Sequence, residues 1–333
     1  MRVLTLSTLF PDAGRPAFGG FVERQTQGLA ARPGVAVRVV APIGIPPLLA
    51  RHPRYAALAA LPAQEERGGL LIDRPRFPVI PGPGAPLTPT LLAGRLLPLL
   101  RAIRRDFRFD VIDAEFFWPD GPAAIRLGRA LGVPVSIKAR GADIHYWGHR
   151  RLCGPQVIAA GRAAAGLLAV SGRLRDDMIA LGMPPDRIAV HHTGVDLDRF
   201  APADRAGAKA ALGLNGPVLL TIGHLIARKG QAIAIDALAR VPGATLLIAG
   251  DGPDRAALDA RAAAAGVAGR VRFLGPMPHA ALPALFAAAD IFVLPTASEG
   301  LANVWVEAVA SGVPVVTTDV GGARAVIDRP TAG

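Results

Sequence analysis

Short apolar runs recur along the chain, and patterns with helical spacing separate several of them. In the first half, such runs predict strands at 3–7, 35–41, 111–114, 135–138, 167–170 and 188–191. Apolar positions at helical spacing predict helices at 21–31, 91–105, 122–131 and 172–181, the last with Ser171 as its N-cap. Continuous apolar strands that alternate with helices are typical of a parallel sheet covered on both faces.

The second half repeats this alternation more regularly. Strands are predicted at 218–222, 245–249, 271–273, 291–294 and 314–317, with helices near 231–240, 254–265, 280–289 and 302–311. The fold class is therefore α/β, with two Rossmann-like domains that face a cleft. We expect an N-terminal domain at 1–195, a linker at 196–213 and a C-terminal domain at 214–333. Segment 42–89, rich in Pro, Gly and Arg, predicts long loops and a short helix near 55–61.

Composition narrows the functional class. Of 333 residues, 51% are apolar and 19% are charged, which is a globular composition. The single cysteine, Cys153, excludes an internal disulfide framework and a cysteine zinc cluster, and it favours a reducing cytoplasm. Aromatic residues make up only 5%, and no nucleic-acid-binding motif accompanies the net charge of +11, so we expect no nucleic-acid partner. We expect no metal site, because His191-His192 lacks a partner at metal-ligand spacing and Asp196-Leu197-Asp198 lies in the segment between the two domains, where a structural role is expected.

The strongest chemical signal lies between residues 295 and 308. An apolar strand is followed by a loop that contains Glu299, and a helix begins shortly after it. The backbone amides of residues 300–303 then lie at a helix N-terminus, where they can bind a diphosphate. Glu307 lies one turn deeper and can accept hydrogen bonds from two hydroxyls, as a ribose offers. The alternative is that Glu299 caps the helix and Glu307 is solvated.

Two more loops have the composition of ligand sites. Residues 221–230 again pass from a strand into a helix and carry Lys229, whose charge at a strand's carboxyl end can neutralise an anionic ligand. The alternative for Lys229 is a solvated helix start, and for His224 a hydrogen-bonded loop residue. Gly19 and Gly20 precede the first helix, where backbone can approach a ligand closely, and the alternative there is a plain turn.

At this point the sequence resembles the retaining glycosyltransferases of family 4, which have the two-domain GT-B fold. Glu299 and Glu307 fit their E-x7-E element, and the resemblance runs along nearly the whole chain. The further matching motifs, in chain order, are 194–196 with Phe200, 223–230, 250–253, 273–275, 310–316 and 319–322. Each motif is weak alone, whereas their order and spacing together are specific.

The resemblance implies transfer of a sugar from a UDP-, GDP- or ADP-sugar, with retention at the anomeric carbon and no cofactor. Donor binding would fall to Gly19, Gly20, His224, Arg228, Lys229, Glu299, Gly300, Leu301, Ala302, Asn303 and Glu307. The implied catalytic residues are Lys229, Glu299, Asp143 and Arg140. His224 stands where the family commonly has Arg, and Arg140 stands at the His of an H-G-x-D pattern whose Asp matches Asp143.

The family also implies a hexosyltransferase of class EC 2.4 that serves polysaccharide biosynthesis. Its acceptor would be lipid-linked, a polysaccharide or a small molecule. The alternatives are a nucleotide-sugar-binding pseudo-enzyme, an inactive fragment or a GT-B nucleotide-sugar epimerase. Family members continue for several tens of residues beyond the last residue here, so we expect a second domain that lacks its C-terminal helices.

Charge distribution suggests a second partner. Residues 1–200 hold 26 basic and 16 acidic side chains, and the remainder hold 11 and 10. Arg101, Arg104, Arg105 and Arg108 follow an apolar helix at near-helical spacing. Such a surface can lie on anionic lipid. We therefore expect a cytoplasmic protein that contacts the membrane peripherally, or one with a polyanionic acceptor; the alternative is a solvated Arg-rich face.

Overall fold

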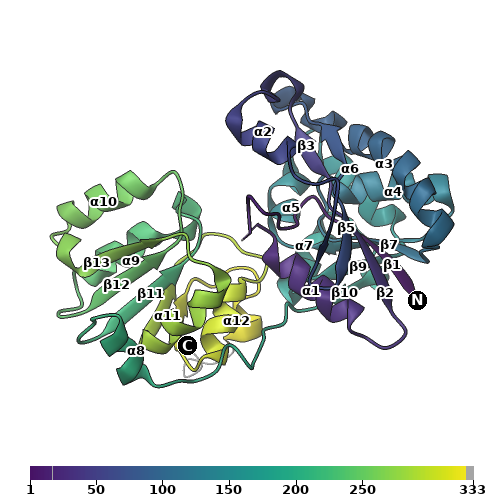
Figure 1. Ribbon diagram of the computed structural model, residues 1–333. Helices are drawn as coiled ribbons and strands as arrows, with labels where there is room; N and C mark the ends of the chain where they lie inside the picture. Colours follow the sequence, from purple (N-terminus) through teal and green to yellow (C-terminus); the bar gives the residue numbers. More distant parts are fainter. Residues whose placement is uncertain (17, 328–333) are drawn as a thin grey trace. The chain divides into compact units, whose positions relative to one another are not determined.

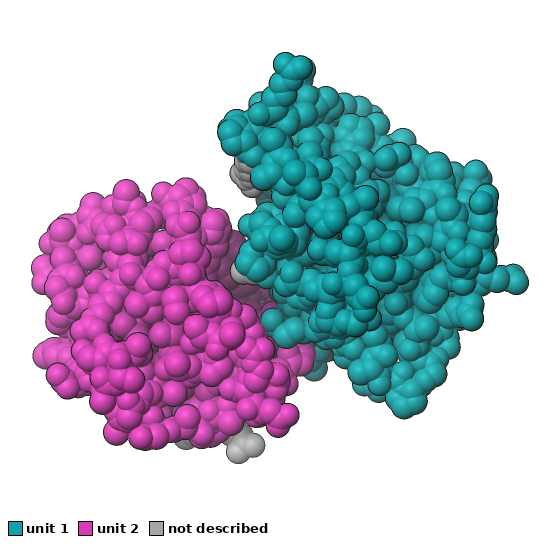
Figure 2. Space-filling view, in the orientation of Figure 1, with its two compact units in different colours: residues 1–193 teal, residues 194–333 magenta. Residues whose placement is uncertain are grey.

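The computed structural model describes residues 1–16 and 18–327 (Figure 1). The chain forms two compact units, Met1–Thr193 and Gly194–Gly333, which Figure 2 colours separately. Residues 196–213, predicted as a linker, fall within the second unit. They contain helix α8 (Arg205–Ala211), which packs against α11 (Leu282–Ala288) of the same unit.

The first unit is built on an eight-stranded sheet in the order β10-β9-β8-β7-β1-β2-β5-β4. Its strands are β1 (Arg2–Leu6), β2 (Ala36–Val40), β4 (Gln64–Arg67), β5 (Leu70–Asp73), β7 (Val111–Ala114), β8 (Val135–Ala139), β9 (Gly166–Ala169) and β10 (Ile188–Val190). Every pairing is parallel except that of β4 with β5. A small parallel sheet pairs β3 (Ile43–Ile45) with β6 (Arg76–Pro78).

Helices cover this sheet and fix its core. They are α1 (Gly20–Ala30), α3 (Thr88–Asp106), α4 (Asp120–Leu131), α5 (Ala142–His145), α6 (Gly154–Ala163) and α7 (Gly172–Ala180), whereas α2 (Pro53–Ala59) packs against β3 of the small sheet. Val22 of α1 packs with Val39 and Ile72 of the sheet, while α4 lies between α3 and α6. Because β1 leads to β2 and β7 leads to β8 in opposite directions along the sheet, right-handed crossovers place α1 and α4 on opposite faces. As predicted, Ser171 caps α7, accepting a hydrogen bond from the Leu174 amide at 3.2 Å.

The second unit is a parallel five-stranded sheet in the order β13-β12-β11-β14-β15. Its strands are β11 (Val218–Ile222), β12 (Thr245–Ala249), β13 (Val271–Gly275), β14 (Ile291–Leu294) and β15 (Val315–Thr317). Its further helices are α9 (Gln231–Leu238), α10 (Arg255–Ala264), α12 (Asn303–Ala310) and α13 (Ala323–Val326). All five residues of β11 are buried, as expected of a central parallel strand. The prediction of two Rossmann-like units is confirmed.

Segment 42–89 contains more regular structure than predicted. The expected short helix is present as α2, but β3, β4, β5 and β6 were not predicted. Strand β4 reads Gln-Glu-Glu-Arg and shows no apolar alternation, because it is an edge strand that pairs on one side only.

Candidate functional site

The strand order of the second unit locates its ligand site. Strand β11 has β12 and β13 on one side and β14 and β15 on the other. The switch point of the strand order therefore lies between β11 and β14. In open α/β sheets, ligands bind at the carboxyl ends of the strands that flank this switch point. The loops that follow β11 and β14 are residues 223–230 and 295–302, and both were singled out from the sequence.

Hydrogen bonds join these two loops. The Ala297 amide donates to the Arg228 carbonyl at 2.8 Å, and the buried Thr296 hydroxyl donates to the same carbonyl at 3.0 Å. The Glu299 carboxylate accepts from Lys229 Nζ at 2.5 Å and from Arg228 Nη1 at 3.2 Å. The predicted residues Arg228, Lys229 and Glu299 are therefore brought together at one strand edge.

Burial gives this ion pair a defined geometry. The side chains of Lys229 and Glu299 are 15% and 12% exposed, whereas that of Arg228 is 42% exposed. A half-buried pair is screened less by salt than a surface pair. Glu299 therefore holds the Lys229 ammonium at the switch point, and Arg228 adds a more accessible cation. Two cations and one carboxylate leave a net positive charge at this position, which favours an anionic ligand.

Glycines allow the neighbouring loops to approach one another. A Cβ on Gly230 would lie 2.1 Å from the Pro295 carbonyl oxygen, and one on Gly250 would lie 1.9 Å from that of Gly223. Likewise, a Cβ on Gly321 would lie 1.9 Å from the Glu299 carbonyl oxygen. All three also have positive φ angles, of 71°, 143° and 54°. These contacts give a packing reason for the glycine motifs noted in the sequence.

The loop after β14 runs into the N-terminus of α12. Gly300, Leu301 and Ala302 are buried there, and the carbonyl of Gly300 accepts a hydrogen bond from the Gly322 amide at 2.7 Å. No side chain caps α12, which starts at Asn303 within the described part of the chain. The first-turn amides of an uncapped helix favour an anion. The structure thus places the predicted residues 300–303 at the same strand edge as Lys229.

Glu307 lies inside α12 and is only 5% exposed. Its Oε1 is 2.8 Å from Nε2 of His279, and the His279 ring packs against Phe200 at a centroid distance of 5.2 Å. The sequence analysis missed His279. Its signal was a lone histidine a few residues after the predicted strand that ends near Phe273. His279 orients one carboxylate oxygen of Glu307.

His224 has a backbone partner in a neighbouring loop. Its Nδ1 donates to the Asp251 carbonyl at 2.5 Å, and its own carbonyl accepts from Gln231 Nε2 at 3.2 Å. The ring joins the loop after β11 to the loop after β12. This matches the alternative of a hydrogen-bonded loop residue, and the side chain stays exposed beside the site.

In the first unit, Arg140 belongs to a buried charge network at the carboxyl ends of β7 and β8. Its Nη2 donates to Gln25 Oε1 at 2.7 Å and forms an ion pair with Glu115. Its Nη1 is buried and has no hydrogen-bond partner among the described residues. The neighbouring Lys138 Nζ lies 2.8 Å from His191 Nδ1. Burial lowers the pKa of Lys138 to about 8.

Asp143 is fully buried and organises the loop after β8. Its two carboxylate oxygens accept backbone hydrogen bonds from Phe117, Arg140, Gly141 and Ile144, at 2.8–3.2 Å. Burial raises the pKa of its carboxyl. A carboxylate occupied in this way has no surface left for a substrate. The catalytic role implied by the resemblance stays a prediction, and the geometry favours a positioning role.

Gly19 is required by the local backbone, with a φ of 71° at the N-cap of α1. A Cβ on Gly19 would lie 2.4 Å from the Leu9 carbonyl oxygen, whereas one on Gly20 would meet no atom closer than 3.6 Å. Gly19 thus fits the alternative of a tight turn, and contact of either glycine with a donor stays a prediction.

The part of the chain that the structure describes holds no cluster of three His, Cys, Asp or Glu side chains that could bind a metal ion. Within the same residues, none of the helices combines the length and the apolar character that a membrane span requires.

The family models divide the chain much as the structure does. The model described as "Glycosyltransferase Family 4" matches residues 21–199, and the model "Glycosyl transferases group 1" matches residues 204–332. Among curated proteins, TuaC of Bacillus subtilis (strain 168), assigned as a teichuronic acid biosynthesis glycosyltransferase, is 28% identical over 99% of this chain and 84% of its own length. D-inositol 3-phosphate glycosyltransferase of Mycobacterium bovis is 42% identical, over 42% of this chain and 31% of the relative.

Solved structures share the fold. Anabaena HepE in complex with UDP has a TM-score of 0.73 and 22% identity, over 99% of this chain and 84% of that one. Sucrose-phosphate synthase from Thermosynechococcus elongatus has a TM-score of 0.74 and 20% identity, over 98% and 84%. The GT-B assignment is confirmed, whereas the predicted truncation finds no support in these comparisons. Since the first model spans more than half of the residues, the chain belongs to glycosyltransferase family 4.

Proposed function

We propose that this protein is a retaining glycosyltransferase that transfers a hexosyl group from a nucleotide-diphosphate sugar to an acceptor. The observation that carries the proposal is the Lys229–Glu299 pair, held beside the uncapped N-terminus of α12 at the switch point of the second sheet. TuaC, assigned to teichuronic acid biosynthesis, and HepE, solved with UDP, support a nucleotide-sugar donor.

The donor residues divide the work by charge. Lys229 and Arg228 neutralise the diphosphate as the bond to the anomeric carbon breaks, because negative charge develops there. The amides of residues 300–303 bind the same phosphates and the sugar. Glu307 accepts hydrogen bonds from ribose hydroxyls, and the contact with His279 orients its carboxylate for them. Glu299 keeps Lys229 in place and lies near the transferred sugar.

The acceptor in this proposal is lipid-linked or a polysaccharide, and the first unit receives it. Arg140 is the candidate catalytic residue there, because its Nη1 is buried with no hydrogen-bond partner among the described residues. Asp143 positions the backbone of Arg140 through its amide.

Nucleotide binding tests the donor site. Isothermal titration with UDP, GDP and ADP should show one preferred nucleotide, and Lys229→Met and Glu307→Ala should each weaken it about tenfold or more. The matched control is Lys209→Met, since Lys209 forms a similar ion pair with Asp290, at 2.6 Å and 19% exposed. The control should bind like the parent. Equal nucleotide affinity in the parent and in both site variants would overturn the proposal.

We also propose that the first unit lies against an anionic membrane surface. Arg101, Arg105 and Arg108 are exposed, which supports three of the four arginines predicted for this surface. Arg104 is turned inward, where it bonds to the Leu131 carbonyl and lies over the Phe109 ring. We therefore no longer assign Arg104 to the basic surface.

A further inference from the structure

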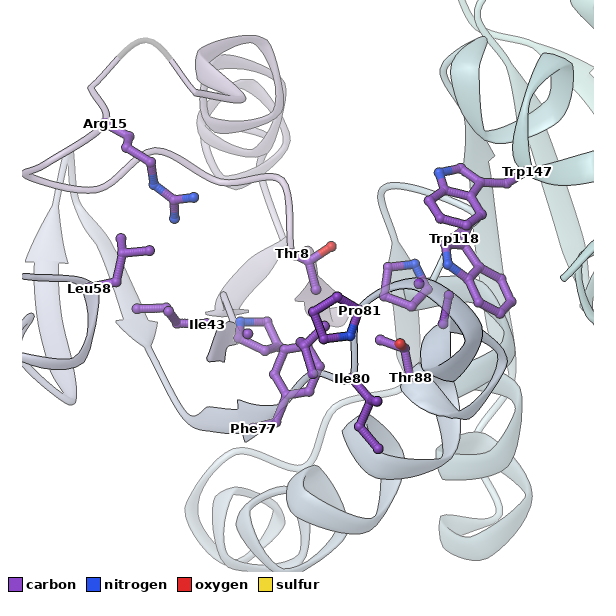
Figure 3. Close-up of a pocket in the computed structure, with 16 residues that line it drawn as sticks. Thr8, Arg15, Ile43, Leu58, Phe77, Ile80, Pro81, Thr88, Trp118 and Trp147 are labelled. Carbon is purple, nitrogen blue, oxygen red and sulfur yellow. The ribbon is translucent and has the colours of Figure 1, made fainter. Parts of the chain in front are cut away.

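A pocket of about 350 Å³ lies within the first unit. Thr8 follows β1, Ile43 follows β2, and Trp118 and Pro119 follow β7, so the pocket opens at the carboxyl edge of the first sheet (Figure 3). Strand β1 is the point at which this sheet reverses direction, with β2 on one side and β7 on the other. Strand order therefore marks this pocket as a ligand position, as it does for the second unit.

The lining is largely apolar. Aliphatic and aromatic side chains dominate it, among them Ile43, Leu58, Phe77, Ile80, Trp118 and Trp147. In Figure 3, Ile43, Phe77, Ile80 and Leu58 surround one part of the space, and the two indoles close the other. Trp118 and Trp147 stack at a centroid distance of 5.4 Å.

Polar groups in the lining are few. Only Thr8, Arg15 and Thr88 contribute polar side chains besides the indoles. The Nε and Nη2 of Arg15 are already bonded to Asp12, at 2.9 and 2.6 Å, and Thr88 is buried. A sugar ring carries several hydroxyls, each of which needs a partner when it leaves water. The pocket therefore fits a hydrocarbon better than a sugar.

Exposed apolar side chains continue beside the pocket. Ile80 lines it and is 43% exposed, and Leu87 ends the short helix Gly82–Leu87 that supplies Gly82 and Ala85 to the lining. Tyr146 precedes Trp147 and is half exposed. Exposed apolar side chains next to the lining residues of an apolar cavity favour a ligand that extends out of it.

We propose that this pocket binds the hydrocarbon chain of the acceptor, which makes the acceptor an amphiphile with an alkyl or prenyl chain. The inference rests on the proposed function and names the class of its acceptor. The chain lies among Ile43, Phe77 and Trp118, and it leaves past Ile80. Arg15, the charged residue of the lining, faces the polar part of the molecule.

Tryptophan fluorescence reads the pocket directly. Of the three tryptophans, Trp118 and Trp147 line the pocket, and Trp305 is buried in the second unit. A dodecyl glucoside with bromine atoms on its chain, added below its critical micelle concentration, should quench this fluorescence saturably. Unbrominated dodecyl glucoside should reverse the quenching, and methyl glucoside should not. Absence of quenching, or reversal by phenyl glucoside as effective as by the dodecyl compound, would overturn the inference.

Two variants locate the binding. Ile80→Gln should lower the affinity for the dodecyl compound about tenfold, and Ala85→Phe, which fills the cavity, should do the same. Leu71→Gln is the matched control, because Leu71 is 38% exposed on β5 and does not line the pocket. It should bind like the parent. If Leu71→Gln weakened binding as much as Ile80→Gln, the quenching would reflect surface adsorption and the assignment would fail.

A parallel titration with UDP, GDP and ADP separates this inference from the proposed function. Nucleotide binding without chain binding would overturn the pocket assignment and leave the glycosyltransferase proposal standing. Chain binding with no nucleotide binding would overturn the proposed function, and the pocket's assignment to an acceptor with it.

Discussion

The two units have the same kind of switch point but different chemistry around it. In the second unit, the loops after β11 and β14 bring together Lys229, Glu299 and the uncapped start of α12. In the first unit, the loops after β1 and β7 border an apolar pocket. Strand order thus fixes where a ligand binds, and the residues of the loops decide what it is.

The two units also differ in how deeply their charged side chains are buried. The Lys229–Glu299 pair keeps some exposure to solvent, whereas Arg140, Glu115 and Asp143 of the first unit are almost fully buried. Burial makes each of the latter groups depend on its hydrogen-bond partners. We therefore expect substitutions in the second site to change binding, and substitutions of the buried carboxylates Glu115 and Asp143 to change stability.

The largest expected loss of stability comes from a substitution that breaks the contact between the loops of the second unit. Gly230→Ala places a Cβ 2.1 Å from the Pro295 carbonyl oxygen at a φ of 71°, and it should lower the free energy of unfolding by about 4 kcal/mol. Gly243→Ala is the control, because its φ is 70° and no atom lies within 4 Å of the added Cβ. Strain alone should cost about 1 kcal/mol there. Urea denaturation measures both, and equal losses would contradict the interlocking of the loops.

The next effect tests whether Asp143 positions or catalyses. Asp143→Ala leaves several buried amides without an acceptor and should destabilise the first unit by about 3 kcal/mol. Nucleotide affinity of the second unit should stay unchanged. Asp176→Ala, at an exposed aspartate with a 59% exposed side chain, should shift stability by less than about 0.5 kcal/mol. A stable Asp143→Ala variant that had lost only transfer would instead favour a catalytic role.

The buried carboxyl of Asp120 should make the stability of the protein depend on pH. Burial raises the pKa of Asp120 to about 7, and its Oδ1 has no hydrogen-bond partner among the described residues. The folded state therefore binds this proton more tightly than the unfolded state, so the stability that the proton contributes is lost as pH rises through 7. Between about pH 4.5 and 7, the parent should lose about 1.4 kcal/mol per pH unit relative to Asp120→Asn. Denaturation curves that run parallel for the two proteins would show that Asp120 does not titrate this way.

The smallest effect concerns the basic surface of the first unit. Arg101→Glu with Arg105→Glu should reduce co-sedimentation with phosphatidylglycerol vesicles several-fold, since each cation near an anionic surface contributes about 1 kcal/mol. Arg173→Glu with Arg175→Glu changes the net charge equally on α7 and serves as the control. Equal losses in both variants would mean that total charge, and not this surface, sets the affinity.

Local patterns carried most of the fold. Continuous apolar strands such as β11 and the capped start of α7 were readable because their signals lie within a few residues. Strands β4 and β5 were not predicted, and β4 itself is the polar run Gln64–Arg67. The adjacent Gly68-Gly69, with φ angles of 54° and 76°, forms a two-residue hairpin turn and was the available signal.

The site divides in the same way. The positions of Lys229 and Glu299 follow from their places after β11 and β14, and their ion pair follows from strand adjacency. The His279–Glu307 contact joins residues 28 positions apart, and the Arg140–Gln25 contact joins residues 115 apart. Contacts of that kind depend on tertiary packing. The apolar pocket was hidden for the same reason, because its lining comes from six or more separate segments.

The glycine contacts of the second unit constrain how this enzyme could be redesigned. Gly230, Gly250 and Gly321 let four chain segments touch backbone to backbone, so no one of these segments has room to change its course alone. A graft that aims to alter donor preference would need to transplant the segments around Gly223, Gly250, Pro295 and Gly321 as one set. Exchange of side chains on a retained backbone is the more economical route.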